Sequence, residues 1–323
     1  MIELRTLRVA TFLACVLAAF FPGAPARGAY PEKPIRLIVP SPPGGGNDIM
    51  ARLAGQKLTE AWGKQVLVDN RPGAGGAIAF EMAARAEPNG YTLLLGSTNF
   101  TVLPDITKVN YDPIKDFVPV SLMAKSMNIL LVHPTVPVES AKELIALAKA
   151  NPGKLNYGAS IATSVHLAAE LFKAMAGVDI VLVPYKGMGS VLLDLVVGNV
   201  DLAFSNPAAS YSYVRSGRLR ALAVTGERRS SMLPDVPTMA EAAIPGFEAS
   251  TWWGILAPAG TPTVVVSEVN GKLARALTQR EMTDRFAALG ADPVGGPPQR
   301  LAEHLHSEIP KWREVIRAAN IRL

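Results

Sequence analysis

The sequence predicts an α/β protein of two lobes, in which each lobe is a sheet flanked by helices and crossover strands join the lobes. Three observations lead to this fold class. Short apolar strands alternate with amphipathic helices in two successive series, the pattern of sheets covered by helices. Extended segments separate the two series. The chain has 323 residues, a length that fits two domains of ordinary size.

The first series runs from residue 35 to residue 99. Its first helix carries apolar residues from Met50 to Trp62 at helical spacing. We expect Asn47 or Asp48 to cap this helix by accepting a hydrogen bond from a free backbone N–H. Because strands and helices alternate, we also expect a parallel sheet covered on both faces. The expected strands are 35–39, 65–68 and 91–95, and the second helix is 77–86.

The second series runs from residue 129 to residue 226, and a different tail follows it. The tail begins with spaced prolines, continues with an apolar strand holding Trp252 and Trp253, and is then mostly helical. We therefore predict that lobe 1 comprises 27–124 and 226–323 and that lobe 2 comprises 125–225. The expected strands of the second series are 129–132, 155–157, 180–183, 202–204 and 219–224, and its helices are 141–150, 165–176 and 191–197.

The amino end has the pattern of a secretory signal peptide. Arg5 and Arg8 precede an apolar run over 9–21, and Ala24-Pro25-Ala26 forms an A-x-A cleavage site. The run is shorter than the roughly 20 residues of a membrane-spanning helix. We expect cleavage after Ala26, with Gly28 and Ala29 as alternative sites, and hence a periplasmic protein. Cleavage would also remove the one cysteine of the chain, Cys15, which suits an oxidising compartment.

Charge and motifs argue against several function classes. The leader holds two arginines against Glu3, so subtracting its net +1 from the total of +5 leaves +4 for the mature chain. This charge is dispersed, which favours anionic ligands mildly but does not form the basic stripe of a nucleic-acid reader. There is no Walker loop, the GAG at 73–75 lacks the third glycine of a dinucleotide loop, and the four histidines have no zinc spacing. We expect no cofactor and no metal.

The candidate ligand residues follow the strands, because ligands of open α/β sheets bind off the carboxyl ends of the strands. These loops combine glycines with short hydroxyl and amide side chains, and two of them lead into helices whose starts favour anions. Turn and cap chemistry can account for each loop taken alone. The candidates are Ser41, Pro42, Gly44, Gly45, Asn47, Asp48, Ser97, Thr98, Asn99, Ser160, Thr163, Ser164, His166, Tyr185, Lys186, Ser205 and Asn206.

Within this set we expect different roles. The glycines at 44–46 allow backbone N–H groups to approach a ligand closely, and Asp48 supports their loop. Ser160, Thr163 and Ser164 are expected to donate to a carboxylate. Lys186 is either a nucleophile or charge partner, or a lysine of a surface turn.

One enzyme reading stays open from the residues alone. The run at 158–162, GASIA, lies between a strand and a helix and is one residue short of the G-x-S-x-G nucleophile elbow. Ser160 would be the nucleophile of a hydrolase, but the sequence nominates no acid and base to complete a triad.

Motifs along nearly the whole mature chain resemble one family, the Bug-type extracytoplasmic solute-binding proteins of tripartite tricarboxylate transporters. In two places the chain departs from the family pattern: Ser41 and Pro43 replace a phenylalanine and an alanine, and Ile161 and Ala162 add apolar bulk to a polar loop. The shared motifs are PIRLIVP at 34–40, GGGND at 44–48, NRPGAGG at 70–76, PNGYTL at 88–93, YDP at 111–113, NPGKL at 151–155, HLA at 166–168, VPYKG at 183–187, LRALAVT at 219–225, LPDVPT at 233–238 and APAGTP at 257–262.

The resemblance implies a type II-like periplasmic binding protein and not an enzyme. Its lobes would close on a di- or tricarboxylate, an acidic amino acid or an aromatic acid, which it would deliver to integral membrane permease subunits. The resemblance places the ligand between the loop at 42–48 and the helix start at 160–166, with ordered waters helping to hold it. A periplasmic sensor with the same lobes is the alternative. With one capture cleft per chain and no heptad pattern, we expect a monomer.

Overall fold

The structure is a computed structural model that describes residues 30–161, 163–185 and 187–322. Lys33–Leu323 forms one unit by its internal contacts, and the description below concerns that unit. The predicted leader, 1–26, lies outside the described residues. In the described part of the chain, no helix is both long and apolar enough to cross a membrane.

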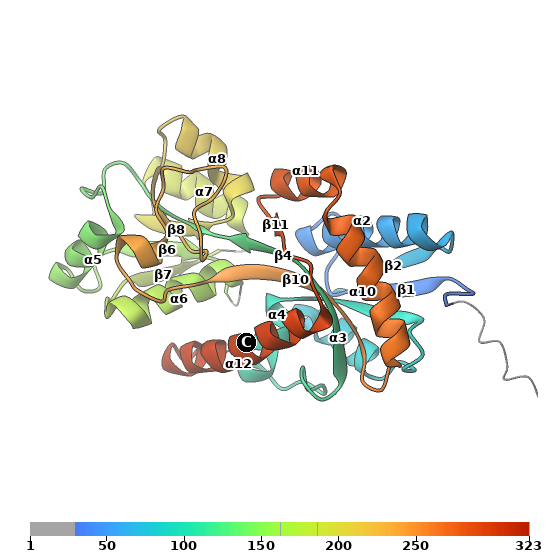
Figure 1. Ribbon diagram of the computed structural model, residues 1–323. Coiled ribbons are helices and arrows are strands. Elements are labelled where there is room, and N and C mark those ends of the chain that lie inside the picture. Colours follow the sequence, from blue (N-terminus) through green and yellow to red (C-terminus); the bar gives the residue numbers. More distant parts are fainter. Residues whose placement is uncertain (1–29, 162, 186, 323) are drawn as a thin grey trace, which may run out of the picture. The chain divides into compact units, whose positions relative to one another are not determined.

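The first sheet has six strands and is mixed (Figure 1). They are β1 (Ile35–Val39), β2 (Val66–Asn70), β3 (Thr92–Ser97), β4 (Phe117–Met127), β10 (Ser250–Pro258) and β11 (Asp292–Pro293). Their order across the sheet is β11-β4-β10-β3-β1-β2. β1 is parallel to β2 and β3, whereas β10 lies antiparallel between β3 and β4.

The second sheet has five strands with a related arrangement. They are β5 (Ile129–Val132), β6 (Asn156–Ala159), β7 (Val181–Pro184), β8 (Leu202–Ser205) and β9 (Arg220–Val224), in the order β7-β6-β8-β5-β9. β6 is parallel to β7 and β8, and β5 lies antiparallel between β8 and β9.

The three strands of the first series, β1, β2 and β3, pair in parallel as predicted, but both sheets are mixed because the chain passes between them twice. β4 of the first sheet leads into β5 of the second after the single residue Asn128, and β10 returns to the first sheet after β9. Each incoming strand inserts antiparallel into the sheet it enters. β10 is the fourth strand of the first sheet counted from β2, and β5 is the fourth strand of the second sheet counted from β7. In Figure 1, β4 and β10 run between the two groups of elements.

The two crossings are bonded to each other. The backbone N–H of Asn128 donates to Thr225 Oγ1 at 2.8 Å, and the Thr225 N–H donates to the Asn128 carbonyl at 2.8 Å. Thr225 Oγ1 donates to the Ala249 carbonyl at 2.6 Å. All three residues are almost fully buried. The two connections therefore form one bonded joint between the sheets.

Helices cover both sheets, and each helix predicted in the two series is present. The elements that the sequence did not predict are β4, β11, α4, α8 and α9. The helices are α2 (Gly46–Trp62), α3 (Ala77–Ala84), α4 (Thr98–Ile106), α5 (Ala141–Ala150), α6 (Ser164–Ala176), α7 (Met188–Val197), α8 (Pro207–Arg215), α9 (Met239–Ala242), α10 (Thr263–Leu277), α11 (Arg280–Ala288) and α12 (Pro298–Ala318), with the 3-10 turn η1 (Ala74–Gly76).

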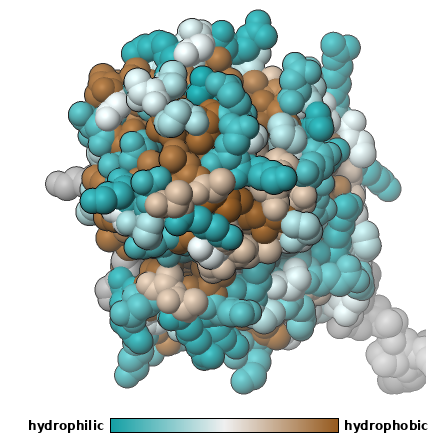
Figure 2. All heavy atoms as spheres, turned by 90° about the vertical axis from the view of Figure 1, so that its left-hand side faces the viewer, coloured by the Kyte–Doolittle hydropathy of each residue, from teal (hydrophilic) through white to brown (hydrophobic). Residues whose placement is uncertain are grey.

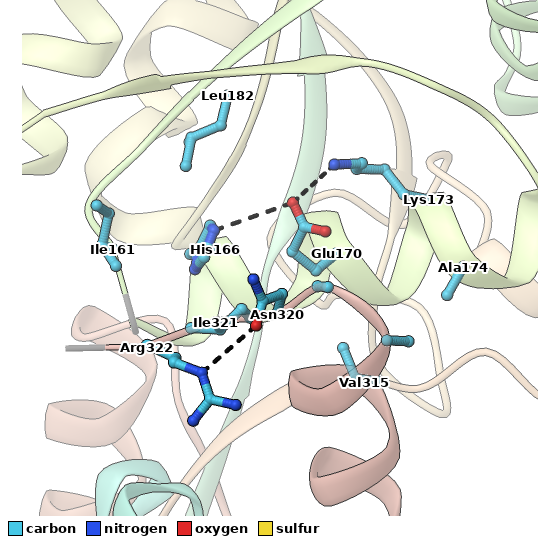
Figure 3. Close-up of a pocket in the computed structure, with 12 residues that line it drawn as sticks. Ile161, His166, Glu170, Lys173, Ala174, Leu182, Val315, Asn320, Ile321 and Arg322 are labelled. Carbon is cyan, nitrogen blue, oxygen red and sulfur yellow. Dashed lines mark hydrogen bonds and ion pairs between the residues drawn. The ribbon is translucent and has the colours of Figure 1, made fainter. Parts of the chain in front are cut away.

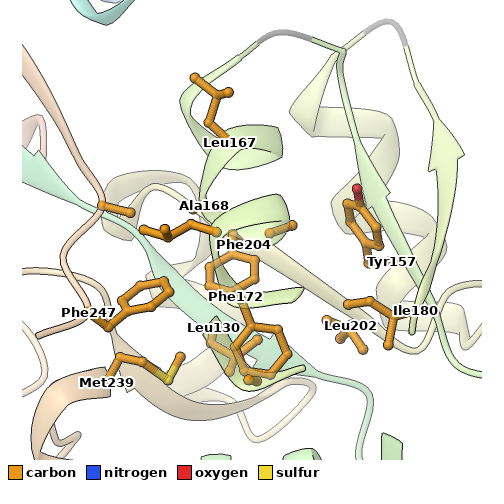
Figure 4. Close-up of a cluster of buried hydrophobic side chains, with 14 of the residues drawn as sticks. Leu130, Tyr157, Leu167, Ala168, Phe172, Ile180, Leu202, Phe204, Met239 and Phe247 are labelled. Atoms are coloured by element: carbon orange, nitrogen blue, oxygen red, sulfur yellow. The ribbon is translucent and has the colours of Figure 1, made fainter. Parts of the chain in front are cut away.

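Each sheet has its own apolar core, and two helices belong to both. Phe80 and Phe100 meet edge to face at 5.3 Å in the first core. The second core packs Phe172 and Phe204 against β5 and β6 (Figure 4). α12 contributes Leu305 to the first core and further residues, among them Trp312, to the second, and α4 is likewise shared. The lobe limits at 124/125 and 225/226 stay a prediction.

Some apolar side chains of the elements around the second sheet remain exposed. Leu193 and Val197 of α7 are 61% and 66% exposed, and Val181 of the edge strand β7 is 48% exposed. Figure 2 looks onto the left-hand side of Figure 1 and shows hydrophobic surface set among hydrophilic side chains.

Candidate functional site

The predicted ligand residues do lie where the strands end. The loop at 41–45 links β1 to α2, Ser97 ends β3, and Thr98 and Asn99 open α4. In the second sheet Ser160 follows β6, Tyr185 follows β7, and Ser205 ends β8. Because β1 and β3 are parallel, as are β6, β7 and β8, each set gathers at one edge of its sheet.

Asp48 organises the first loop, although not as a helix cap. α2 begins at Gly46, and its N-cap Gly45 makes no side-chain cap bond, so the predicted capping by Asn47 or Asp48 is wrong. The buried Asp48 carboxylate accepts from the Gly44 N–H at 2.9 Å, from Arg52 Nε at 2.9 Å and from Asn70 Nδ2 at 3.0 Å. Burial alone would raise the pKa of Asp48, but these three bonds outweigh it and hold the pKa below its ordinary value.

The three glycines leave the backbone of this loop open. Gly44 has φ +87°, which a side chain rarely adopts. Gly45 has an ordinary conformation, and a Cβ there would meet only the Pro42 carbonyl oxygen, at 3.8 Å. Pro42, Gly44 and Gly45 are all exposed. Because the Gly44 N–H already donates to Asp48, the N–H groups that this loop can offer to a ligand are those of Gly45 and Gly46.

Asn47 connects three elements of the first sheet. Its Oδ1 accepts from Trp253 Nε1 of β10 at 2.8 Å, and its Nδ2 lies 3.5 Å from Ser97 Oγ of β3. Trp253 was not among the site residues predicted from the sequence. The signal was available only in part: two adjacent tryptophans in a strand must point to opposite faces, but which of them reaches the strand-end loops is a matter of register.

The start of α4 holds a buried hydroxyl without a partner. Thr98 is 3% exposed, and its Oγ1 makes no hydrogen bond to any described residue. Ser41 Oγ, two residues after the end of β1, is also buried and has no hydrogen-bond partner among the described residues. The Asn99 side chain, by contrast, is bonded to the neighbouring loop, because its Nδ2 donates to the Gly75 carbonyl at 3.2 Å.

The loop between β6 and α6 repeats this arrangement in the second sheet. Ser160 Oγ is buried and has no hydrogen-bond partner among the described residues. Thr163 is the N-cap of α6 but makes no side-chain cap bond, and its hydroxyl donates to the Ser160 carbonyl at 2.6 Å. Ser164 is the first residue of the helix. A serine nucleophile needs a base within hydrogen-bond reach, and Ser160 Oγ contacts none in the described part of the chain.

His166 lines a cavity together with Ile161 of the strand-end loop (Figure 3). It stacks on Tyr157 and lies 4.0 Å from Glu170, which also accepts from Lys173 at 3.0 Å. Burial lowers the pKa of His166 against the opposing charge of Glu170. The cavity of about 620 Å³ lies between α6, β7 and the end of α12.

The remaining candidates are partly engaged. Tyr185 donates to Asp194 at 2.6 Å, and burial, together with that carboxylate, raises the Tyr185 pKa to about 12. Asn206 caps α8 by accepting from the Ala208 N–H at 2.9 Å and donates to Ser126 at 2.7 Å. Ser205, before it, is fully buried. Lys186 lies outside the described residues, and no group of three or more metal-binding side chains occurs among those described.

Comparison with known proteins identifies the family of this chain. The model of the TctC family, the tripartite tricarboxylate transporter family receptor, matches residues 50–321. The chain belongs to the TctC family. This confirms the resemblance noted from the motifs. TctC receptors are periplasmic solute-binding proteins, and the two-lobed α/β fold agrees with that of their solved structures.

Curated relatives cover nearly all of this TctC chain. A UPF0065 protein from the tcbD-tcbE intergenic region of Pseudomonas sp. strain P51 is 40% identical over 291 residues, 89% of this chain and 87% of its own length. Protein BugT of Bordetella pertussis is 37% identical over 298 residues, 91% of each chain.

Two solved TctC-like structures carry ligands. R. palustris Rpa4515 with adipate is 38% identical, with a TM-score of 0.76 over 91% of this chain and 99% of its own. MatC (Rpa3494) of Rhodopseudomonas palustris with bound malate is 30% identical, with a TM-score of 0.73 over 89% and 100%.

Proposed function

We propose that this TctC protein is secreted to the periplasm, captures a small carboxylate between the strand-end loops of its two sheets, and delivers it to membrane permease subunits. One observation carries the proposal. Four buried hydroxyls have no hydrogen-bond partner among the described residues, and three of them follow the strands β1, β3 and β6: Ser41, Thr98 and Ser160, whereas the fourth, Ser121, lies within β4. Buried polar groups in native proteins are nearly always paired, so a ligand or its waters is the natural partner.

The chemistry of these loops favours an anion held by neutral donors. Hydroxyls donate, Gly45 and Gly46 can offer backbone N–H groups, and α2, α4 and α6 begin at these loops with their positive dipole ends. Such donors can hold a carboxylate directly or through ordered water. They suit a carboxylate better than a cation, which would need acceptors.

The ligands of the two relatives narrow the class. Adipate and malate are both dicarboxylates of modest size. We infer that this chain takes a dicarboxylate or a comparable acid, acts as a monomer, and performs no reaction on it. Delivery to a permease, instead of to a sensor, rests on the family description of a transporter receptor.

The proposal includes closure of two lobes, 27–124 with 226–323 and 125–225, about the bonded joint at Asn128 and Thr225. A ligand shifts such an equilibrium only through different contacts in the open and closed states. A carboxylate that contacts both loops has such contacts only when the lobes are close.

The test starts from the mature chain, beginning after Ala26. Mass spectrometry of small molecules released from the purified protein identifies any co-purified acid, and thermal-shift assays with adipate and malate follow. At a hundredfold excess over its dissociation constant, a cognate acid should stabilise the protein by about 2.7 kcal/mol. No released acid, with no shift across a carboxylate panel, would contradict the proposal. Small-angle scattering with the bound acid should show a smaller radius of gyration, and an unchanged radius at saturation would contradict lobe closure.

A further inference from the structure

Trp253 and Ser97 are direct partners across two strands. They face each other in the antiparallel pair of β10 and β3, so their side chains share one face of the sheet. Trp253 is 7% exposed and Ser97 is 5% exposed. The start of α2 lies over both, because a Cβ built on Gly46 would stand 3.8 Å from the Trp253 ring. This places the first turn of α2 against the end of β3.

The indole fixes the orientation of the Asn47 amide. An indole N–H can only donate, whereas an asparagine amide can donate or accept. With Trp253 Nε1 at 2.8 Å, the group facing the indole must be Asn47 Oδ1. The Nδ2 group, with two N–H donors, then faces Ser97 Oγ at 3.5 Å, the outer limit of a hydrogen bond.

The same polarity extends to the start of α4. Ser97 Oγ acts as the acceptor for Asn47, so its own O–H is available to donate. Ser97 is the N-cap residue of α4 yet makes no side-chain cap bond. Beside it, Thr98 Oγ1 has no partner among the described residues and is almost fully buried. Donors therefore gather where α4 begins.

We propose that Trp253 is a positioning residue of the carboxylate site, which holds Asn47 as a donor so that Asn47, Ser97 and Thr98 together bind one carboxylate group at the start of α4. The inference rests on the proposed function and adds a residue and a mechanism to it. Because the Trp253 indole can only donate, it keeps the Asn47 N–H groups directed toward the ligand. These neutral donors select an anion without any arginine or lysine.

Trp253→Phe tests this directly, because it keeps an aromatic ring and removes the N–H. The Asn47 amide can then turn over and present its oxygen to the ligand. Calorimetry with adipate should show about tenfold weaker binding, equal to 1.4 kcal/mol. Trp62→Phe is the matched control: it also removes an indole hydrogen bond on α2, to Glu268 at 2.9 Å, but at the far end of the helix. It should bind adipate like the wild type.

A double-mutant cycle separates positioning from general damage to the fold. If Trp253 acts through Asn47, then Trp253→Phe should have no further effect in an Asn47→Ala protein. In the wild type, adipate should shift the nuclear magnetic resonance signal of the Trp253 indole N–H, and this shift should be lost in Asn47→Ala. Equal weakening by Trp253→Phe in both backgrounds would overturn the inference.

Asn47→Asp gives a second test that does not alter the core. It keeps the bond to the indole but places a negative acceptor toward Ser97, so adipate binding should fall at least a hundredfold. Wild-type affinity in this variant would also overturn the inference. A wild-type protein that binds neither adipate nor malate nor any other acid of a panel contradicts the proposed function itself, and with it the role given to Trp253. Wild-type binding with unchanged Trp253→Phe and Asn47→Asp variants contradicts only the positioning role.

Discussion

Asp48→Asn should destabilise the protein more than the loss of an ordinary helix cap. The Asp48 carboxylate accepts three hydrogen bonds while 3% exposed. The amide has one oxygen, so its NH₂ group must face a donor, either Asn70 or the pair of Gly44 and Arg52. Asn70 cannot turn over to accept without losing its own bond to the Ser41 carbonyl at 3.0 Å.

The expected loss follows from these contacts. A hydrogen bond to a charged group contributes about 1.5–3 kcal/mol, and a buried donor left unpaired adds its own penalty. We expect Asp48→Asn to lower the free energy of unfolding by about 2–3 kcal/mol, against about 1 kcal/mol for a cap. Freed from the carboxylate, the loop at 44–46 should also bind the ligand more weakly.

The pH dependence has a definite sign. The folded-state pKa of Asp48 lies below its ordinary value, so its contribution is complete above the unfolded pKa of about 4 and disappears as the pH falls through the folded pKa. The stability gap between wild type and variant should therefore be constant near neutrality and narrow below about pH 4.

Urea unfolding followed by tryptophan fluorescence measures this gap. Asp284→Asn is a matched control, since Asp284 also lies four residues from an arginine, but the pair is exposed and 3.6 Å apart. Such surface pairs contribute little, so the control should unfold like the wild type. An Asp48→Asn protein as stable as the control at pH 7 would refute the reasoning, as would a gap that does not narrow in acid.

Three further predictions follow from individual contacts. Gly45→Val should fold normally, since space surrounds its Cβ position, yet abolish carboxylate binding by calorimetry; retained binding would contradict the role of the loop. Ser160→Ala should leave thermal stability unchanged and weaken binding by about 1.5–3 kcal/mol, and wild-type affinity would remove Ser160 from the site. Lys311→Met should cost about 3–5 kcal/mol at neutral pH in urea unfolding, because Lys311 neutralises Glu308 and, at 2.8 Å, Glu248. Burial already raises the pKa of Glu308, so this cost should shrink as acid protonates it; a cost independent of pH would contradict the assignment.

Much of the fold could be predicted because its signals are local. β1 and α5 have the predicted bounds, since an apolar strand and an amphipathic helix each end at clear turn residues. α4 was missed because it contains Pro104, and α8 because it begins with Pro207 and follows a strand end without an apolar periodicity of its own. Prolines read as breaks in a sequence, although Pro207 stands at the first position of its helix, where proline is tolerated.

The candidate site was predictable in its loops but not in its contacts. The succession of strand, polar loop and helix along the sequence already placed Ser41, Thr98 and Ser160 after strands. The contact between Trp253 and Asn47 joins residues 206 positions apart, and it depends on β10 inserting antiparallel beside β3. His166 was predicted at the same loop, but its position on α6 turns it toward Tyr157 and Glu170. Register and helix rotation decide such cases, and neither is encoded in a short motif.

The central claim is that one carboxylate ligand is held between the loops of both sheets. Calorimetric titration of the mature wild type, Gly45→Val and Ser160→Ala with the tightest-binding acid of a carboxylate panel tests it most directly. We expect one ligand per wild-type chain, no measurable binding to Gly45→Val, and clearly weaker binding to Ser160→Ala. Full affinity in either variant would confine the ligand to one sheet, and the absence of binding by any carboxylate to the folded wild type would contradict the claim altogether.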